Sequence, residues 1–444
     1  MNHRLLIAVS IAFAPLTAAA ENLVQVYQDA RAYDATYAAA RYALQAGMEK
    51  LPQGRALLLP SVNFTASATE SRLESDSKNP AIAPTLTFTR DLSVQQAQLT
   101  LTQPLYRAQN FIQYDQSELQ VKQAESQFGQ ASQDLIVRVA VAYFEMLGAQ
   151  DSLRLVRGQK AAIAEQLAQA KRNFEVGTAT ITDTHEAQAR YDLSQAQEIS
   201  ALNDVEAKRR ALQQLTGKVY EELKPLRADV KLSPPNPNNM QAWVDLAEKQ
   251  SYPVLVQDSA AEIASLEAKR NNAGHYPTLD LVASYAYTQQ SGSQFTSIGS
   301  YLNNASVGLQ FALPIYQGGG ISSRTREAAS NYERAKQDLE NARRSSALTA
   351  RQSYLSVIAG VAQVRALEQA VVSSGSALDS NKLGYEVGVR INIDVLNAQQ
   401  QVFSTERDLL AARYNTIANT LRLKAAAGSL REEDVEEVNR VLEP

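Results

Sequence analysis

The sequence has 444 residues and no cysteine, so it can form neither disulfide bonds nor thiolate metal sites. It has three histidines, and the two beyond residue 20, His185 and His275, have no second histidine close to them in the sequence. We therefore expect no zinc, no haem and no other cofactor. Gly318-Gly319-Gly320 lacks the Lys and Ser or Thr of a phosphate-binding loop, and no serine lies in a Gly-x-Ser-x-Gly motif. These absences predict that the protein is not an enzyme.

Long apolar runs are also missing. Beyond residue 20 no segment approaches roughly eighteen consecutive apolar residues, which predicts that no helix spans a membrane. Residues 1–20 contain Arg4, a short apolar core over 5–13 and small residues at 18–20. This pattern predicts a secretory signal peptide, with a buried N-terminal helix as the alternative. The formal net charge of −4 argues against a nucleic-acid partner.

Four short stretches alternate apolar side chains with small polar or amide side chains, the pattern of a β-strand with two different faces. They are 61–69, 96–102, 279–288 and 305–313. We expect Pro104 and Pro314 to end the second and fourth strands, and the polar segments 70–93 and 289–304 to be loops. The sequence therefore predicts two β-hairpins, at about 61–103 and about 278–313.

The polar faces of these strands carry almost no charge, which suits a water-filled lumen better than an ordinary solvent face. Tyr106, Tyr285, Tyr287 and Tyr316 lie at or near strand ends, where a membrane barrel has its aromatic girdle. The alternative is a half-exposed antiparallel sheet of a soluble domain. Four strands are too few to close a membrane barrel, and open edges in lipid leave costly unpaired backbone groups. A membrane-spanning sheet would therefore require several copies of the chain.

Long helical segments make up most of the remaining chain. Residues 111–174 contain no proline, and apolar residues recur in alternating steps of three and four along 153–174, 364–385 and 393–421. Such seams predict coiled-coil packing. Lys160, Asn381 and Arg407 interrupt the seams, as helices that line a wide tube would tolerate. Residues 21–55 open with a helical pattern. The shorter helical segments 240–250, 254–272 and 432–442 are expected to form a small mixed belt beside the long helices.

Two polar turns, 176–183 and 387–394, are related by a fixed offset of 211 positions, as between Phe174 and Tyr385. The same offset relates Tyr143 to Tyr354 and Gly217 to Gly428. This self-similarity predicts a duplicated unit in which each turn is the tip of a long helical hairpin. The expected boundaries are 1–20 for the signal peptide, 21–218 for repeat 1, 219–239 for a connector, 240–428 for repeat 2 and 429–444 for a C-terminal equatorial segment.

Asp183 and Asp394 lie at these tips and allow two interpretations. An Asp at a helix N-terminus caps free backbone amides and complements the helix dipole. In a ring of protomers, however, a tip Asp becomes a ring of carboxylates that biases a pore toward cations.

Taken together, these features resemble the TolC family of trimeric outer-membrane efflux and secretion channels, across essentially the whole chain after residue 20. The segments that carry the resemblance are 21–27 (ENLVQVY), 313–319 (LPIYQGG) and the paired Val-Gly turns that end in Asp183 and Asp394. The resemblance implies an α+β membrane protein with four strands per protomer in a trimeric twelve-strand β-barrel. The barrel continues into a long α-helical coiled-coil-like tunnel with a small mixed equatorial domain.

The resemblance also implies roles for residues at the tips. Tyr385 would pair with Asp183 and Arg390 with Thr182, as a latch that closes the periplasmic entrance. Asp394 would form a constricting carboxylate ring, and Asn397, where the family pattern has a second Asp, makes that ring less negative. The docking sites for a periplasmic adaptor would be the turn residues Val176, Gly177, Thr178, Val387, Gly388 and Val389.

The implied function is that of a passive exit duct of tripartite efflux pumps or type I secretion systems, in the outer membrane of a Gram-negative bacterium. Its expected partners are two further copies of the chain, an adaptor (membrane fusion) protein, outer-membrane lipid and an inner-membrane transporter of the RND, ABC or MFS type. The alternative is a structural or receptor-type coiled-coil surface protein without transport.

Overall fold

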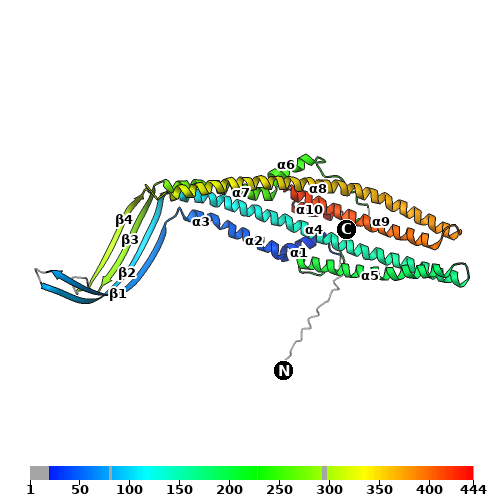
Figure 1. The fold of residues 1–444 in the computed structure, drawn as a ribbon, viewed down its shortest axis with the longest axis horizontal. Coiled ribbons are helices and arrows are strands. Elements are labelled where there is room, and N and C mark those ends of the chain that lie inside the picture. Colours follow the sequence, from blue (N-terminus) through cyan, green and yellow to red (C-terminus); the bar gives the residue numbers. More distant parts are fainter. Residues whose placement is uncertain (1–19, 80–82, 228, 293–297, 444) are drawn as a thin grey trace, which may run out of the picture. The chain divides into compact units, whose positions relative to one another are not determined.

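The computed structural model describes residues 20–79, 83–227, 229–292 and 298–443 (Figure 1). The predicted signal peptide falls outside these residues except for its last position. Within the described residues the chain forms two compact units. The first comprises the segments up to Arg41, Gly129–Val254 and from Arg343 onward, and the second comprises Tyr42–Phe128 and Leu255–Ala342. Each unit contains parts of both predicted repeats.

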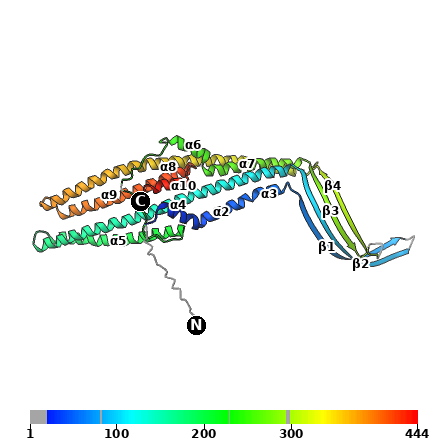
Figure 2. The same cartoon turned by 180° about the vertical axis from the view of Figure 1, so that it is seen from behind.

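Helices account for most of the chain, as the sequence predicts. The shorter ones are α1 (Leu23–Tyr33), α2 (Ala35–Met48), α3 (Lys50–Ala56), α6 (Met240–Gln250), α7 (Tyr252–Asn272), a 3₁₀ turn at Ala273–His275 and α10 (Glu432–Asn439). The long ones are α4 (Ala108–Glu175), α5 (Ile181–Thr216), α8 (Gly320–Glu386) and α9 (Asn392–Ala426). Figures 1 and 2 show α4 beside α5 and α8 beside α9, so the long helices form two hairpins.

The four strands form one antiparallel sheet in the order β1-β2-β3-β4. Their bounds are β1 (Ser61–Asn79), β2 (Ala83–Arg107), β3 (Thr278–Gln290) and β4 (Ser300–Ala312). This arrangement confirms the four-stranded sheet, and it corrects the loop predicted at 70–93. Most of that segment is paired strand, from Glu70↔Ser93 to Ser77↔Leu86. The prediction failed because polar residues without apolar alternation still form strands when a partner strand satisfies their backbone groups.

Cross-strand register separates the two faces of the sheet. One face carries apolar rows such as Phe64–Leu99–Tyr285–Ala305 and Val62–Leu101–Ala283–Val307. The intervening rows on the other face are polar, as in Asn63–Thr100–Ser284–Ser306. Because directly opposite residues share a face, the alternation read from the sequence is aligned across all four strands. Phe64 is 69% and Val307 76% exposed, so the apolar face is uncovered in the single chain.

Pro104 does not end the second strand as predicted, because β2 continues to Arg107. Pairing with β1 stops at Thr102, and the pairing with β3 shifts register between Pro104 and Tyr106. A proline lacks a donor N–H, and strands tolerate it at such a bulge where one neighbour has ended. The fourth strand ends at Ala312, just before Pro314, as expected.

The N-terminal helical segment is interrupted at Asp34, which lies between α1 and α2. Its carboxylate accepts a hydrogen bond from the Tyr37 backbone amide at 2.7 Å and one from Arg138 Nη1 at 2.9 Å. The hydrogen bond from Arg138 is the main cause that lowers the pKa of Asp34. A carboxylate that satisfies free amides at the start of α2 explains the break in the helix there.

The predicted belt has a core of its own, where Trp243 of α6 packs with Val357, Val361, Leu423 and Ala427. Two isolated β-bridges, Glu21↔Leu223 and Leu226↔Leu442, join the chain ends to the connector. Helices with bridging strand pairs make this region mixed, as predicted. Residues 255–272 of α7, also expected to join the belt, belong instead to the second compact unit.

By length and composition alone, one helix in the described part of the chain, α8, could cross a membrane, with a mean hydropathy of 1.3 over its most apolar window. This differs from the expectation of no such helix. The apolar side chains Val357 and Val361 of α8 are buried against the belt. Only 17% of that window is buried within the described chain, so this packing accounts for a small part of its apolar composition.

Candidate functional site

The two hairpin tips have the same backbone hydrogen bonds. At the first tip the amides of Val176, Gly177 and Thr178 donate to the carbonyls of Arg172, Phe174 and Asn173 at 3.2, 3.0 and 2.8 Å. At the second tip Val387, Gly388 and Val389 donate to Leu383, Tyr385 and Gly384 at 3.1, 3.1 and 2.8 Å. Each bond maps onto its counterpart by the offset of 211. Gly177 (φ 80°) and Gly388 (φ 78°) adopt the left-handed conformation that ends a helix.

At the first tip Thr180 and Asp183 form a reciprocal cap at the start of α5. The Thr180 hydroxyl accepts from the Asp183 amide at 3.3 Å, and the Asp183 carboxylate accepts from the Thr180 amide at 2.9 Å and hydroxyl at 2.8 Å. This arrangement satisfies the orphan donors of the first turn. The capping interpretation of Asp183 is therefore confirmed within the chain.

At the second tip the capping position is occupied by Ile391, whose side chain makes no capping hydrogen bond. The Asp394 carboxylate lies instead 3.7 Å from Arg390 Nη1, with the Asp side chain 33% exposed. This is an ion pair without hydrogen-bond geometry, and exposed pairs of this kind contribute little to stability. The Asp394 carboxylate is thus available for other contacts, whereas the Asp183 carboxylate is occupied by its hydrogen bonds to Thr180.

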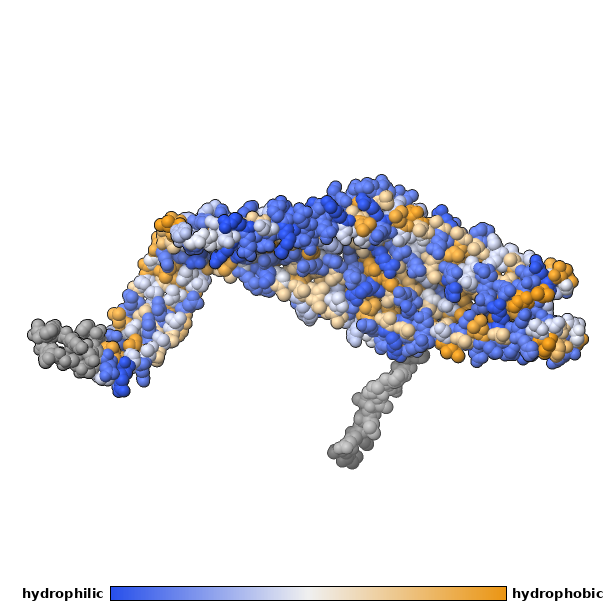
Figure 3. Space-filling model, in the orientation of Figure 1, coloured by the Kyte–Doolittle hydropathy of each residue, from blue (hydrophilic) through white to orange (hydrophobic). Residues whose placement is uncertain are grey.

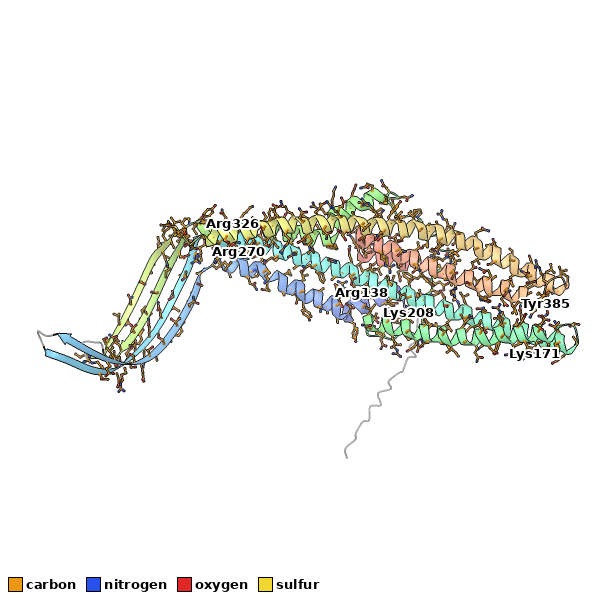
Figure 4. The ribbon with its side chains drawn as sticks, in the orientation of Figure 1. Arg138, Lys171, Lys208, Arg270, Arg326 and Tyr385 are labelled. Carbon is orange, nitrogen blue, oxygen red and sulfur yellow. The ribbon has the colours of Figure 1, made fainter. Side chains whose placement is uncertain are left out.

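The four predicted latch residues are not joined to one another within the described chain. The Tyr385 hydroxyl accepts a hydrogen bond from Asn173 Nδ2 at 3.3 Å, which ties α8 to α4. Figure 4 shows Tyr385 near the end of α8. Thr182 is exposed, Asp183 is bound to Thr180, and Arg390 is paired with Asp394. The latch therefore remains a prediction for the assembled protein. Asn173 was not predicted, since its only sequence signal is its place one residue before Phe174.

Asn397, the second predicted constriction residue, is held by Arg190 of α5. Arg190 Nη2 donates to Asn397 Oδ1 at 2.8 Å, and Nη1 donates to Gln400 Oε1 at 2.6 Å. One guanidinium therefore links α5 of the first hairpin to α9 of the second. With Arg390 beside Asp394, it places a second cation near the predicted constriction. The sequence did not reveal this contact, because the apolar seam of residues 184–216 is too irregular to fix the helix register.

The turn residues predicted to dock an adaptor are strongly exposed. Val176 is 73%, Val387 65% and Val389 78% exposed. Figure 3 shows hydrophobic surface gathered at these tips. Further apolar side chains flank them, namely Phe174, Ile181 and Ile391. Apolar side chains at a tip, without a partner in the same chain, mark a surface suited to another protein.

Farther from the tip, polar contacts fasten α4 to α5. Glu198 accepts from Lys160 Nζ at 2.8 Å and from Arg157 Nε at 3.0 Å. Hydrogen bonds from Lys160 and then Arg157 lower the pKa of Glu198. Nearby, Leu167, Ala170 and Ala187 form a small apolar cluster covered by Tyr191. Lys160, which interrupts the predicted seam, is thus a partner for an acid on the facing helix.

Among the described residues, no group of three or more His, Asp or Glu side chains is placed to hold a metal ion. The chemistry that the tips offer is hydrogen bonding, charge and apolar contact.

Comparison with known proteins points in one direction. The model of the outer membrane efflux protein family matches residues 26–218 and 243–429. The outer membrane protein TolC of Vibrio cholerae is 34% identical over 442 residues, covering 99% of this chain and 98% of that protein. The proteases secretion protein PrtF of Dickeya chrysanthemi is 32% identical over 433 residues, covering 97% of this chain and 93% of PrtF.

Solved structures agree on the fold. The outer membrane protein VceC of Vibrio cholerae superimposes with a TM-score of 0.75 at 18% identity, covering 92% of this chain and 96% of VceC. The outer-membrane channel CmeC of Campylobacter jejuni gives a TM-score of 0.73 at 17% identity, covering 100% of this chain and 98% of CmeC.

Proposed function

The chain belongs to the outer membrane efflux protein family, and from this premise we propose how it works. It is an outer-membrane exit duct for efflux and secretion. The family consists of channel proteins, and we propose that this chain, too, performs no catalysis and conducts its cargo passively. Because the chain belongs to this family, the alternative of a structural or receptor-type coiled-coil protein without transport is dropped.

The observation that carries the proposal is the two-faced sheet. An apolar face without a cover in the single chain suits lipid, and an uncharged polar face suits a water-filled lumen. The outer strands, β1 and β4, each pair with one neighbour only. Since lipid cannot satisfy open backbone groups, we propose that three copies close one twelve-strand barrel, with β4 of each chain pairing to β1 of the next.

We propose that the hairpin tips form the gated periplasmic end of the duct. In the assembly Tyr385 and Arg390 would engage Asp183 and Thr182 and hold the tips together. Asp394 and Asn397 would line the constriction. The exposure of Thr182 and the weak pairing of Arg390 support this role, because both groups are free to take a stronger partner.

We propose that a periplasmic adaptor docks on the Val-Gly turns and that an inner-membrane transporter of the RND, ABC or MFS type supplies the energy. PrtF is named for protease secretion, and the matching family is named for efflux. A secreted protein and small drug molecules are therefore both candidate cargoes.

The two sequence repeats, 21–218 and 240–428, each contribute one β-hairpin and one helical hairpin to the proposed duct.

Planar-bilayer recording of the purified protein tests the proposal. We expect a small closed-state conductance from a species whose mass in detergent is that of three chains. A folded, inserted protein that conducts no ions would contradict the exit duct. A conducting species of a different subunit number would contradict the trimer alone.

A further inference from the structure

A polar hollow of about 660 Å³ lies among the four helices that connect directly to the strands. Its lining comes from α3, α4, α7 and α8, and α3 leads into β1, α4 leaves β2, α7 leads toward β3 and α8 follows β4. All of these residues belong to the second compact unit. Its volume falls in the range of small-molecule sites.

The helices that share this hollow are attached to four strands that lie in sequential order in the sheet. We place the hollow on the concave side of the arc that these helices would form in the proposed barrel. In a closed ring the concave side is the inside. The hollow therefore faces the lumen of the proposed duct, and this step rests on the proposed function.

The charged residues that line the hollow are all basic. Three of its lining residues are basic, Lys50, Arg270 and Arg324, and none is acidic. Arg270 is fixed by Gln113 at 2.6 Å and balanced by Glu267 at 2.7 Å. Lys50 and Arg324 are exposed, and neither side chain has a hydrogen bond or ion pair to any residue that the structure describes. Both cationic groups are therefore open to a ligand.

Amide side chains complete the lining. Some already donate a hydrogen bond within the chain, and others do not. Asn110 Nδ2 is used by the Leu57 carbonyl at 2.6 Å, and Asn271 Nδ2 by Glu267 at 2.9 Å. Gln53 and Gln120 line the same hollow, and their side chains have no hydrogen bond within the described part of the chain. Two ammonium or guanidinium groups and two open amides are the donor set that an oxyanion requires.

We propose that Lys50, Arg270 and Arg324 form a basic collar that binds anionic groups, phosphate, carboxylate or sulfonate, on molecules that pass through the lumen. Because every subunit of the proposed trimer carries it, the collar raises the local concentration of anions in the part of the lumen that it lines. The duct thus has a cation-favouring constriction at its tips and an anion-binding collar beside its sheet.

Inorganic triphosphate is a suitable probe, and its ³¹P line width reports binding to the detergent-purified protein at low salt. We expect the wild type to broaden the line, and Lys50→Gln with Arg324→Gln to reduce the broadening severalfold. The control is Arg326→Gln, which removes a charge from the same helix two residues away, roughly 200° around its axis and outside the hollow (Figure 4). All variants should unfold at the same temperature as the wild type, since the substituted side chains are exposed.

Equal broadening by the wild type and the double variant would overturn the collar, and so would an equal loss in Arg326→Gln. The reversal potential in a KCl gradient then tests its place in the duct. We expect the double variant to be more cation-selective than the wild type. Altered triphosphate binding with an unchanged reversal potential would refute the luminal position. Failure of every protein to conduct would overturn the exit duct, while the ³¹P measurement would still decide on the anion site.

Discussion

At the first hairpin tip Thr180 caps α5 and occupies the carboxylate of Asp183, whereas at the second tip Ile391 leaves Asp394 beside Arg390. The turns that carry these residues have the same backbone hydrogen bonds. A duplicated backbone has therefore been kept while its capping side chain has changed. The comparison shows how one turn can be stable and its copy can hold a charge ready for another contact.

A second difference lies in the last turn of the helix that precedes each tip. Tyr385 stands where the first tip has Phe174, and its hydroxyl reaches Asn173 across the hairpins. The copy of the turn has therefore gained a polar contact to the other hairpin that the original phenylalanine could not make.

The largest effect is expected from making the tips alike at this position. Tyr385→Phe together with Arg390→Ser removes both proposed latch donors, and the closed-state conductance in a planar bilayer should rise severalfold. Tyr354→Phe is a matched control, because it removes a hydroxyl that binds Asn238 at 2.8 Å in the first unit, away from the tips. A conducting wild type whose double variant behaves identically would discard the latch residues.

The next effect concerns what the tips share. Gly177→Ala and Gly388→Ala place a Cβ in the left-handed region, and each should destabilise its tip by about 1–2 kcal/mol. No atom lies within 4 Å of either added Cβ, so the cost is conformational strain alone. Hydrogen exchange of the turn amides measures it. Gly375→Ala, in the middle of α8 with equally open surroundings, should instead stabilise by up to about 1 kcal/mol. Loss of protection at only one tip would show that the two turns are not equivalent.

Exchanging the caps should reverse the difference between the tips. Thr180→Ile should weaken the first turn of α5 by about 1 kcal/mol, and Ile391→Thr should strengthen that of α9 by a similar amount. The new threonine would also draw Asp394 into a cap and away from Arg390. Amide exchange in the first turns of α5 and α9 reports both effects. If Ile391→Thr left the protection of α9 unchanged, the difference between the tips would not arise from the cap.

A smaller effect is expected where the hairpins meet. Arg190→Gln removes the hydrogen bonds to Asn397 and Gln400, and the coupling energy to Asn397→Ala should be about 0.5–1 kcal/mol in a double-mutant cycle of thermal unfolding. The control cycle pairs Arg190 with Gln401, which bonds within its own helix to Thr405 at 3.2 Å. A coupling of zero with Asn397 would mean that this contact does not stabilise the closed tips.

The smallest effect is the pH dependence of the first hairpin. The pKa of Glu198 is lowered in the folded protein, so its contribution is present above the unfolded pKa and is lost as pH falls through the folded pKa. Exchange protection along α4 and α5 should therefore weaken on acidification. Glu198→Gln should reduce that dependence and leave the part due to Glu206 of α5, whose pKa is also lowered by hydrogen bonds from Arg210 and Arg209. The second hairpin also has an ion pair between its two helices, from Arg413 to Glu368 at 2.8 Å. There the acid lies on α8, which leads to the tip, whereas Glu198 lies on α5, which returns from it.

The sequence predicted elements whose side-chain period is strict. Alternation located parts of all four strands, and the offset of 211 located the start of both tips directly after α4 and α8. The last three residues of each predicted tip, 181–183 and 392–394, belong instead to α5 and α9. Prediction from the sequence failed at 70–93, since polar strands have no alternation, and at Pro104, since the end of β1 decides whether a proline is tolerated there. Arg190 was missed because its partners Asn397 and Gln400 lie more than two hundred positions away. Long-range polar contacts depend on helix rotation, which an irregular seam does not encode.

The unpaired strands of the sheet have a genetic consequence. In the proposed trimer every boundary joins β4 of one chain to β1 of its neighbour, so a chain damaged only in β4 still offers an intact β1 and is incorporated. With equal amounts of normal and damaged chain, only about one eighth of randomly assembled trimers contain no damaged boundary. A recessive loss in a monomeric protein thereby becomes dominant here. Most normal chains would be trapped in trimers that contain a damaged boundary, although their own sequence is intact.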